Sequence, residues 1–286
     1  MTQRLFELHE FDLPAHAPAW HETNQIRPAV VIAFARAPVM IQHEGGRAMV
    51  ADQTAAMLYN PGQRYRRGLL DERGDNCLYL ALPEETAREV FGAHDAAAVD
   101  RAGSLAGVPR VPTDAGVALS LARLRRAELA RDRLAADSEG ERLIDAIARL
   151  AAAVSDAPAP AAAPRRASTR AAHEDLVERT RAEIARTYTQ NRGLADIAGA
   201  VHASAFHLAR VFREHTGESV CAYRNHLRLR AAGMLLVETR EPITRIAHRT
   251  GFATHAHMTT AFGRLFGVTP TELRCGGKLP RERARI

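Results

Sequence analysis

Residues 194–217 read LADIAGAVHASAFHLARVFREHTG, and residues 243–267 read ITRIAHRTGFATHAHMTTAFGRLFG. Each segment predicts an amphipathic helix, a tight turn and a second helix that carries Phe and stops at Gly. The segment between them, VCAYRNHLRLRAAGMLLVE at residues 220–238, predicts a long helix that holds both rigidly. Two helix-turn-helix units joined in this way can place two recognition helices in successive major grooves of DNA. The repeat therefore predicts an all-α, sequence-specific DNA-binding domain.

The first copy has an apolar helix face followed by a turn at His202 and Ala203. That face is made by Leu194, Ile197, Ala198 and Val201. Ser204 is a good N-cap for the next helix, because its hydroxyl can accept a hydrogen bond from a free backbone N–H. The first turns of a recognition helix reach the base edges. The candidate DNA-binding residues of this copy are Ser204, Ala205, Phe206, Ala209, Arg210 and Arg213.

The second copy repeats this logic. Pro242 suits the start of a helix, Gly251 ends that helix, and Phe252 fills the core. The candidate DNA-binding residues of this copy are Thr254, His255, Ala256, Thr259 and Thr260.

Net charge divides unevenly along the chain. Of the 286 residues, those from 165 to the end include 21 Lys+Arg and 11 Asp+Glu, which is a net charge of +10. Residues 1–164 carry the remaining 18 basic and 22 acidic residues, a net charge of −4, and the two parts give the total of +6. A basic C-terminal half attracts polyanions, and counterion release would contribute sequence-independent affinity for DNA.

Other features of the sequence argue against membrane and secreted classes. The longest apolar runs, such as AVVIAFA at residues 29–35, are too short to cross a bilayer. The first residues, MTQRLFELHEFDLP, lack the apolar stretch of a secretory signal. Three cysteines, an odd and sparse set, predict no disulfide framework. We therefore expect a cytoplasmic protein without a membrane partner.

Residues 1–112 predict a β-rich domain. Short β-forming runs occur at residues 29–34, 39–42, 55–59 and 76–83, with a Gly45-Gly46 turn between the second and third. Asn60-Pro61-Gly62 fits a type II turn, in which Gly accepts a positive φ. Several short strands separated by turns predict a small barrel or sandwich.

Beyond residue 112 the apolar spacing becomes helical. Residues 113–154 predict a helical hairpin, with Asp137-Ser138 supplying capping groups between its helices. The hairpin could cover the sheet domain or pair with the same hairpin of a second chain, and the sequence leaves both roles open. Residues 155–172 are rich in Ala and Pro and predict a linker. The helical domain follows at 173–275, and a basic tail at 276–286.

Residues 173–275 resemble the DNA-binding domain of AraC/XylS-type transcriptional regulators. The resemblance rests on the two repeat segments, on RLRAAGMLL between them, and on the closing GF…F…FGVTP…R pattern. The segment LYNPGQRYRRGLLDERGDNCLYLALP, residues 58–83, is similar to the sensory domain of some members. The resemblance implies an α+β multidomain protein with a cupin-like β-barrel, a hairpin and two helix-turn-helix units. It also implies transcription control, with operator DNA, RNA polymerase, a small-molecule effector and a second copy of the chain as partners.

Carried over by position, three residues fall on the first recognition helix, namely Phe206, Ala209 and Arg210. Four fall on the second, namely His255, Ala256, Thr259 and Thr260. Thr260 stands where many members carry Arg, and His257 and Met258 replace a more usual aromatic pair. These differences predict that the second helix reads bases weakly, or reads DNA shape and backbone.

Some residues allow more than one role. Arg210 could donate two hydrogen bonds to guanine, contact a phosphate, or pair with Glu214 four residues on. Phe206 could pack on a thymine methyl group or staple the helix to its neighbour. The run Arg64, Tyr65, Arg66 and Arg67 could bind an acid or form a solvated charged face.

Enzymatic chemistry finds little support. His255 and His257 are two residues apart on a helix, so they point about 200° apart and cannot chelate one ion together. Phosphate-binding and nucleophile-elbow motifs are absent from the sequence, and the histidines of the N-terminal half are scattered. We therefore predict no catalytic residue, no metal and no cofactor. Two alternatives remain: a metal-dependent cupin-type enzyme fused to a DNA-binding module, and an architectural protein that binds DNA without sequence preference.

Overall fold

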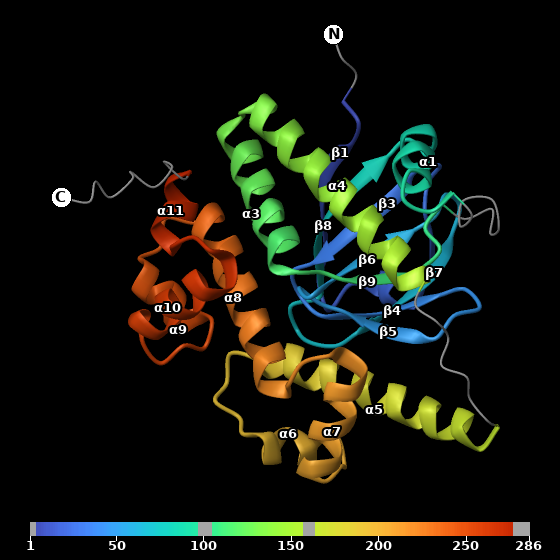
Figure 1. Ribbon diagram of the computed structural model, residues 1–286, viewed down its shortest axis with the longest axis vertical. Helices are drawn as coiled ribbons and strands as arrows, with labels where there is room; N and C mark the ends of the chain where they lie inside the picture. Colours follow the sequence, from blue (N-terminus) through green and yellow to red (C-terminus); the bar gives the residue numbers. More distant parts are fainter. Residues whose placement is uncertain (1–3, 97–104, 157–163, 277–286) are drawn as a thin grey trace.

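The strands of the N-terminal half form two antiparallel sheets that pack against each other (Figure 1). The computed structural model describes residues 4–96, 105–156 and 164–276. One sheet has the order β1-β8-β3-β6-β9 and the other β2-β7-β4-β5. The strand bounds are β1 Glu7–Leu13, β2 Thr23–Gln25, β3 Val30–Ala35, β4 Val39–His43, β5 Ala48–Ala51, β6 Ala55–Tyr59, β7 Arg64–Leu69, β8 Asp75–Leu82 and β9 Arg110–Pro112.

A closed barrel is not formed. Within the described residues no strand of one sheet pairs with a strand of the other. The chain crosses between the sheets through short connections, from β3 to β4 and from β5 to β6, so the sheets stack face to face instead of joining at their edges. The expected cupin-like barrel is therefore an open two-sheet structure.

Alternation along β3 shows how the sequence builds these layers. Ile32 and Phe34 pack with the helices on the outer face of the five-stranded sheet. Ala33 and Ala35 point to the opposite face, where they meet residues of the four-stranded sheet such as Ile41. Side chains in a strand alternate between faces, so a strand that is apolar throughout can be buried on both sides.

Helices cover the outer face of the five-stranded sheet. They are α1 Glu84–Gly92, α3 Ala115–Ala130 and α4 Arg133–Ser155, with a short 3-10 turn η1 at Pro18–His21 elsewhere in the domain. The hairpin bends at Arg131, which has φ 58°, and Asp132 caps α4 by accepting from the N–H of Ala135 at 3.1 Å. The expected break at Asp137-Ser138 is wrong, because these residues lie inside α4.

The C-terminal half is entirely helical within its described residues. Its elements are α5 Pro164–Thr187, α6 Leu194–Ala200, α7 Ala205–Thr216, α8 Val220–Glu238, α9 Ile243–Arg249, α10 His255–Phe266 and α11 Pro270–Cys275. Part of the segment expected as a linker, residues 164–172, belongs to α5. Pro suits the first turn of a helix, and the Ala and Arg residues that follow are good helix formers. Residues 157–163 of that linker and most of the tail lie outside the described residues.

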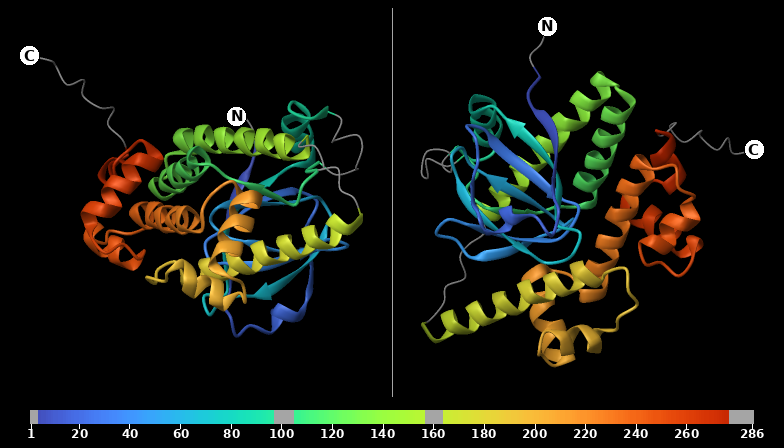
Figure 2. Two further views of the ribbon diagram at one scale, coloured as in Figure 1. Left: turned by 60° about the horizontal axis from the view of Figure 1, so that its bottom comes forward. Right: turned by 180° about the vertical axis from the view of Figure 1, so that it is seen from behind.

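Two apolar clusters fill the helical half. The first is built from α5, α6, α7 and the start of α8. The second is built from the rest of α8 with α9, α10 and α11, and it includes Ala122 of α3. Helix α3 lies between α4 and α8, so the hairpin contacts both halves of the molecule (Figures 1 and 2).

Candidate DNA-binding interface

Two helix pairs in the C-terminal half have the same local design. Helices α6 and α9 each span 7 residues, and α7 and α10 each span 12 residues. The turn between the helices of each pair needs one residue in the left-handed region. This residue is His202, with φ 54°, in the first pair and Gly251, with φ 85°, in the second. A side chain at Gly251 would collide with the backbone of Thr189, so glycine is required there.

Both recognition helices are capped in the same way. The Oγ of Ser204 accepts from the N–H of His207 at 3.3 Å, and the Oγ1 of Thr254 accepts from the N–H of His257 at 3.2 Å. Each helix then stops at a left-handed glycine, Gly217 or Gly267. The predicted Ser204 cap is confirmed. These caps satisfy backbone groups that would otherwise lack partners at the helix ends.

The inner faces of α7 and α10 are fully buried. In α7 the buried side chains are Leu208, Val211 and Phe212, and in α10 they are Met258, Phe262 and Phe266. Burial of one face of each helix fixes which residues face outward. It leaves the first turns of both helices accessible to a partner.

The predicted site residues lie on those outward faces. Phe206, at 82% exposure, is among the most exposed large apolar residues of the described chain. Ser204, Arg210 and Arg213 are exposed beside it, and Ala205 and Ala209 are half-buried. In the second pair the exposed residues are Thr254, His255, Ala256 and Thr260, while Thr259 is half-buried. The structure thus gathers one set on α7 and the other on α10, in two separate helix pairs (Figure 1).

Two of these residues already have partners. Arg210 donates to both carboxylate oxygens of Glu214 at 2.8 and 2.9 Å, which is the (i, i+4) pairing foreseen as one of its roles. His255 Nε2 lies 3.3 Å from the hydroxyl of Thr259. Both partners of the Arg210 ion pair are about half exposed, so the pair is weak and its guanidinium can turn to another acceptor.

A histidine cluster lies beside the first recognition helix. The His173 ring of α5 contacts the rings of His207 and His215 on α7, with centroids 5.6 and 5.5 Å apart. Burial lowers the pKa of His173 below its usual value, and repulsion from His215, His207 and Arg210 lowers it further, against the attraction of Glu214. No local sequence pattern predicts this cluster, because His173 lies in α5 and is far from α7 in the sequence.

Exposed arginines on α9 were also missed. Arg245 has a side-chain exposure of 73%, and Arg249 one of 50%, and both pair with Glu241. The candidate DNA-binding residues predicted from the sequence include Arg210 and Arg213 of the first recognition helix and no arginine of α9. Basic residues on the helix that precedes a recognition helix would have been the signal to follow, since that helix crosses the DNA backbone.

Two negative observations concern metals and membranes. Within the described residues no three His, Cys, Asp or Glu side chains are grouped so that they could hold a metal ion. None of the helices in the described part of the chain is long and apolar enough to cross a membrane.

Comparisons with known proteins match this half of the chain. Residues 197–275 match a family model described as a helix-turn-helix domain. The regulator GlxA of Rhizobium meliloti is 43% identical over 81 residues, which is 28% of this chain and 24% of that protein. The arabinose operon regulatory protein of Escherichia coli is 33% identical over 86 residues, 30% of each chain. Residues 197–275 are therefore a helix-turn-helix domain that is similar in sequence to the matched parts of these regulators.

The matched part spans about a quarter of the length of GlxA and of the activator RhaS of Enterobacter. Among solved structures, an AraC-type regulator from Chromobacterium violaceum covers 39% of this chain and 98% of its own, with 28% identity and a TM-score of 0.35. ToxT of Vibrio cholerae covers 96% of this chain and 98% of its own, with 13% identity and a TM-score of 0.35.

Proposed function

We propose that the whole chain is a sequence-specific transcriptional regulator that binds operator DNA through two helix-turn-helix units, α6–α7 and α9–α10. The observation that carries this proposal is the repeated pair of capped helices whose first turns are exposed. A helix presented in this way can enter the major groove with its N-terminal residues at the base edges. Exposed arginines around it anchor phosphates and fix the register.

In this proposal the first recognition helix carries most of the base reading. Arg210 leaves Glu214 and donates two hydrogen bonds to a guanine, which is the commonest specific contact in the major groove. Phe206 lies one turn earlier and packs against a thymine methyl group. The second helix presents His255, Ala256, Thr259 and Thr260, which are short or uncharged and suit contacts to backbone and groove shape.

Selection of bound fragments from random DNA tests this function. A regulator of this kind enriches one motif with two half-sites about one DNA turn apart. An architectural protein would enrich no motif and would bind all duplexes with the same salt dependence. Metal analysis of the purified chain tests the enzyme alternative, since about one bound transition metal per chain would support a cupin-type enzyme.

We also propose that the two-sheet domain is a sensor for a small molecule. A cavity of about 710 Å³ lies between the two sheets. Its polar lining includes Tyr59, Tyr65 and the ion pair of Arg67 with Asp75, at 3.0 Å. The run of residues 64–67 therefore divides: Arg64 and Arg66 are exposed, whereas Tyr65 and Arg67 line the cavity. A cavity with apolar walls and polar groups aimed into it can bind a small molecule and fix its orientation.

A panel of small organic acids and sugars, screened by thermal shift, tests this sensor. A ligand that binds the cavity raises the melting temperature of the wild-type chain, and it raises that of Tyr65→Phe by less.

We also propose that the chain forms a homodimer and contacts RNA polymerase. Because α3 is covered by α8 in this arrangement, pairing of two hairpins would use the exposed face of α4. Light scattering of the purified chain determines its oligomeric state.

A further inference from the structure

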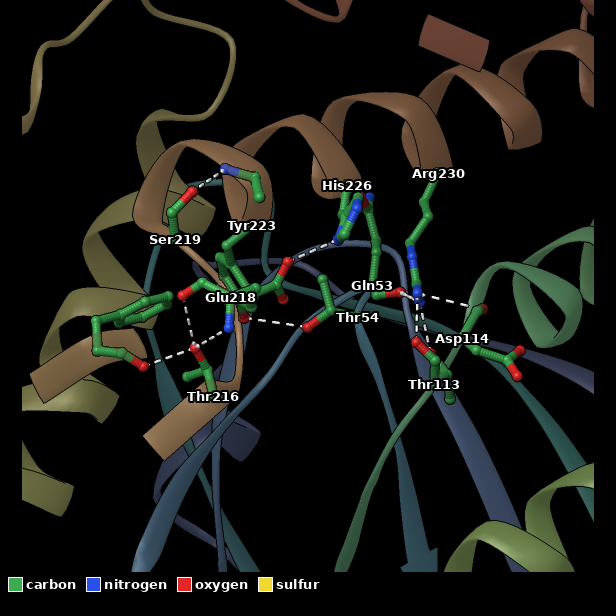
Figure 3. A network of polar contacts seen from close by, with 12 residues as sticks. Gln53, Thr54, Thr113, Asp114, Thr216, Glu218, Ser219, Tyr223, His226 and Arg230 are labelled. Carbon is green, nitrogen blue, oxygen red and sulfur yellow. Dashed lines mark hydrogen bonds and ion pairs between the residues drawn. The ribbon is translucent and has the colours of Figure 1, made fainter. Parts of the chain in front are cut away.

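Helix α8 joins the two helix pairs, and three of its side chains contact the sheet domain: Tyr223 and Arg230 (Figure 3), and Glu238, which pairs with Arg36 near its end. Tyr223 and Arg230 are seven residues apart and therefore lie on the same face of the helix. Both contact the turn between β5 and β6, which consists of Asp52, Gln53 and Thr54. We call the contacts of this turn with Tyr223 and Arg230 the interdomain contact.

The Tyr223 half of this contact is fully buried. The Tyr223 hydroxyl, on a side chain that is 1% exposed, donates to the carboxylate of Asp52. The Thr54 hydroxyl lies 2.7 Å from the same carboxylate and 3.1 Å from the Tyr223 oxygen. Arg181 of α5 adds a hydrogen bond to the Tyr223 oxygen at 3.3 Å. A buried carboxylate needs such partners, so removal of the Tyr223 hydroxyl takes away the hydrogen bond that it donates to Oδ2 of Asp52.

The Arg230 half joins α8 to two other segments. Its guanidinium donates to the carbonyl of Gln53 at 2.8 Å and to that of Asp114 at 3.2 Å, and it also contacts Thr113. Arg230 is only 8% exposed, and burial lowers its pKa although Asp52 opposes the shift. Its charge is thus met mainly by backbone carbonyls. A site of this kind suits the planar guanidinium group of Arg, whose several N–H groups can donate to different carbonyls at once.

The sheet domain holds both helix pairs around this centre. At the first pair, Arg110 of β9 makes two hydrogen bonds, of 2.7 and 2.8 Å, to Glu178 of α5. At the second pair, Ala122 of α3 lies in the apolar cluster of Phe262 and Leu273. The outward faces of α7 and α10 remain exposed, so the sheet domain does not cover the recognition helices.

The same turn borders the cavity. Ala51, at the end of β5, and Met57, in β6, both line the space between the two sheets. Asp52, Gln53 and Thr54 connect these two strands directly. A movement of either strand at the cavity wall therefore reaches α8 through one short, well-bonded turn.

We propose that Asp52, Gln53 and Thr54, acting through Tyr223 and Arg230, set the mutual placement of the two recognition helices and transmit changes at the cavity wall to them. The proposal rests on the proposed DNA-binding function. Tyr223 and Arg230 are positioning residues that touch no DNA themselves. By fixing α8 and both helix pairs to one body, they let the second pair bind without losing further conformational freedom once the first has bound.

The test compares three duplexes: the DNA selected by the wild-type chain, and versions with one or the other half-site scrambled. Tyr223→Phe keeps the ring contact with Phe212 and removes only the hydroxyl, and Arg230→Gln removes the fork. Each should lower affinity for the intact duplex about tenfold and leave affinity for either scrambled duplex within about twofold. Arg88→Gln, an exposed site on α1 with the same charge change as Arg230→Gln, should match wild type throughout. Equal loss on all three duplexes, or none, overturns the proposal.

Hydrogen exchange of the DNA-free chain gives a second, independent measurement. Peptides from α3 and α8 should exchange faster in Tyr223→Phe and Arg230→Gln than in Arg88→Gln, while the sheet interior stays protected. Unchanged exchange overturns the interdomain contact, whatever the DNA results. If the wild-type chain selects no motif, the proposed function fails, and faster exchange would still show that these residues fasten the domains.

Discussion

The two helix pairs have the same construction and differ in what surrounds them. Both use a left-handed turn residue, a hydroxyl N-cap and a glycine stop around a buried aromatic core. The first pair is attached to the sheet domain by ion pairs and buried hydrogen bonds, including Glu178 with Arg110. The second is attached mainly by apolar packing of α3, with Ala122 in its core, and by the ion pairs of Glu238, at the end of α8, with Arg36 and Arg125. The two helix pairs therefore share their internal structure but differ in the contacts that attach them to the rest of the molecule.

The outward faces differ as well. The first recognition helix presents Phe206, Arg210 and Arg213, whereas the second presents mainly small or uncharged side chains. Charged forks and aromatic rings give base discrimination, and short polar groups suit backbone contacts. This difference supports the proposal that the first pair carries most of the sequence specificity and the second mainly anchors the protein to DNA.

The largest expected effect tests the shared construction. Phe212→Ala and Phe262→Ala each remove a ring that is 0% exposed, so each should lower the free energy of unfolding by about 3–5 kcal/mol. Urea denaturation measures both. Phe206→Ala is the matched control, because its ring is 82% exposed, and it should change stability by less than about 0.5 kcal/mol. A small loss at either buried site would contradict the equivalence of the two cores.

The second prediction tests the difference in attachment. Glu178→Gln removes the charge that Arg110 holds and should destabilise the docking of the first pair by about 2–3 kcal/mol. Hydrogen exchange should quicken in α5 and α7 and stay unchanged in α10. Glu141→Gln, on the exposed face of α4, serves as the control. Equal quickening in α7 and α10 would mean that the two pairs are not separately attached.

Much of the repeat was predictable from sequence because its determinants are local. The Ser204 cap, the turn at His202 and the stop at Gly251 each depend on a few neighbouring residues. The run AAMLY predicted β6 with its observed bounds, because β-forming residues and a Pro-Gly turn delimit it. Contacts with residues far away in the sequence do not change these caps and turns, so the local sequence is enough to predict them.

The remaining features depend on distant partners. β7, with the sequence RYRRGL, is too polar to be recognised alone, and its alternation makes sense only beside the cavity. The hairpin bends at Arg131 and Asp132 because Asp132 caps α4, whereas Asp137, the residue predicted to cap, lies inside that helix. The contact of Tyr223 with Asp52 joins residues 171 positions apart, which no local pattern can reveal. Placement of the helix pairs on the sheet domain therefore required the structure.

The third prediction tests the difference in base reading. Arg210→Ala should weaken binding to the selected operator by about 1–3 kcal/mol and relax preference at one base position. Thr260→Ala should cost less, because Thr has no bidentate fork. Titration of both variants on operator and scrambled DNA at two salt concentrations measures this. Uniform weakening by Arg210→Ala, with a salt slope lower by about one, would make Arg210 a phosphate contact.

The smallest expected effect concerns the histidine cluster, which only the first pair possesses. The pKa of His173 is lowered, mainly by burial and then by His215, His207 and Arg210, so folding favours the neutral form of this imidazole. The unfolded chain binds the proton more readily, so the stability that depends on the neutral ring is present above the ordinary histidine pKa of about 6.5 and is lost as the pH falls through the lowered value. Acidification from about pH 7 to 5 should therefore quicken hydrogen exchange in α7 more than in α10, after correction for the intrinsic pH dependence of exchange. His173→Gln removes the titrating group and should abolish this difference. A difference that persists in His173→Gln would assign the acid response to another group, such as His207 or His215.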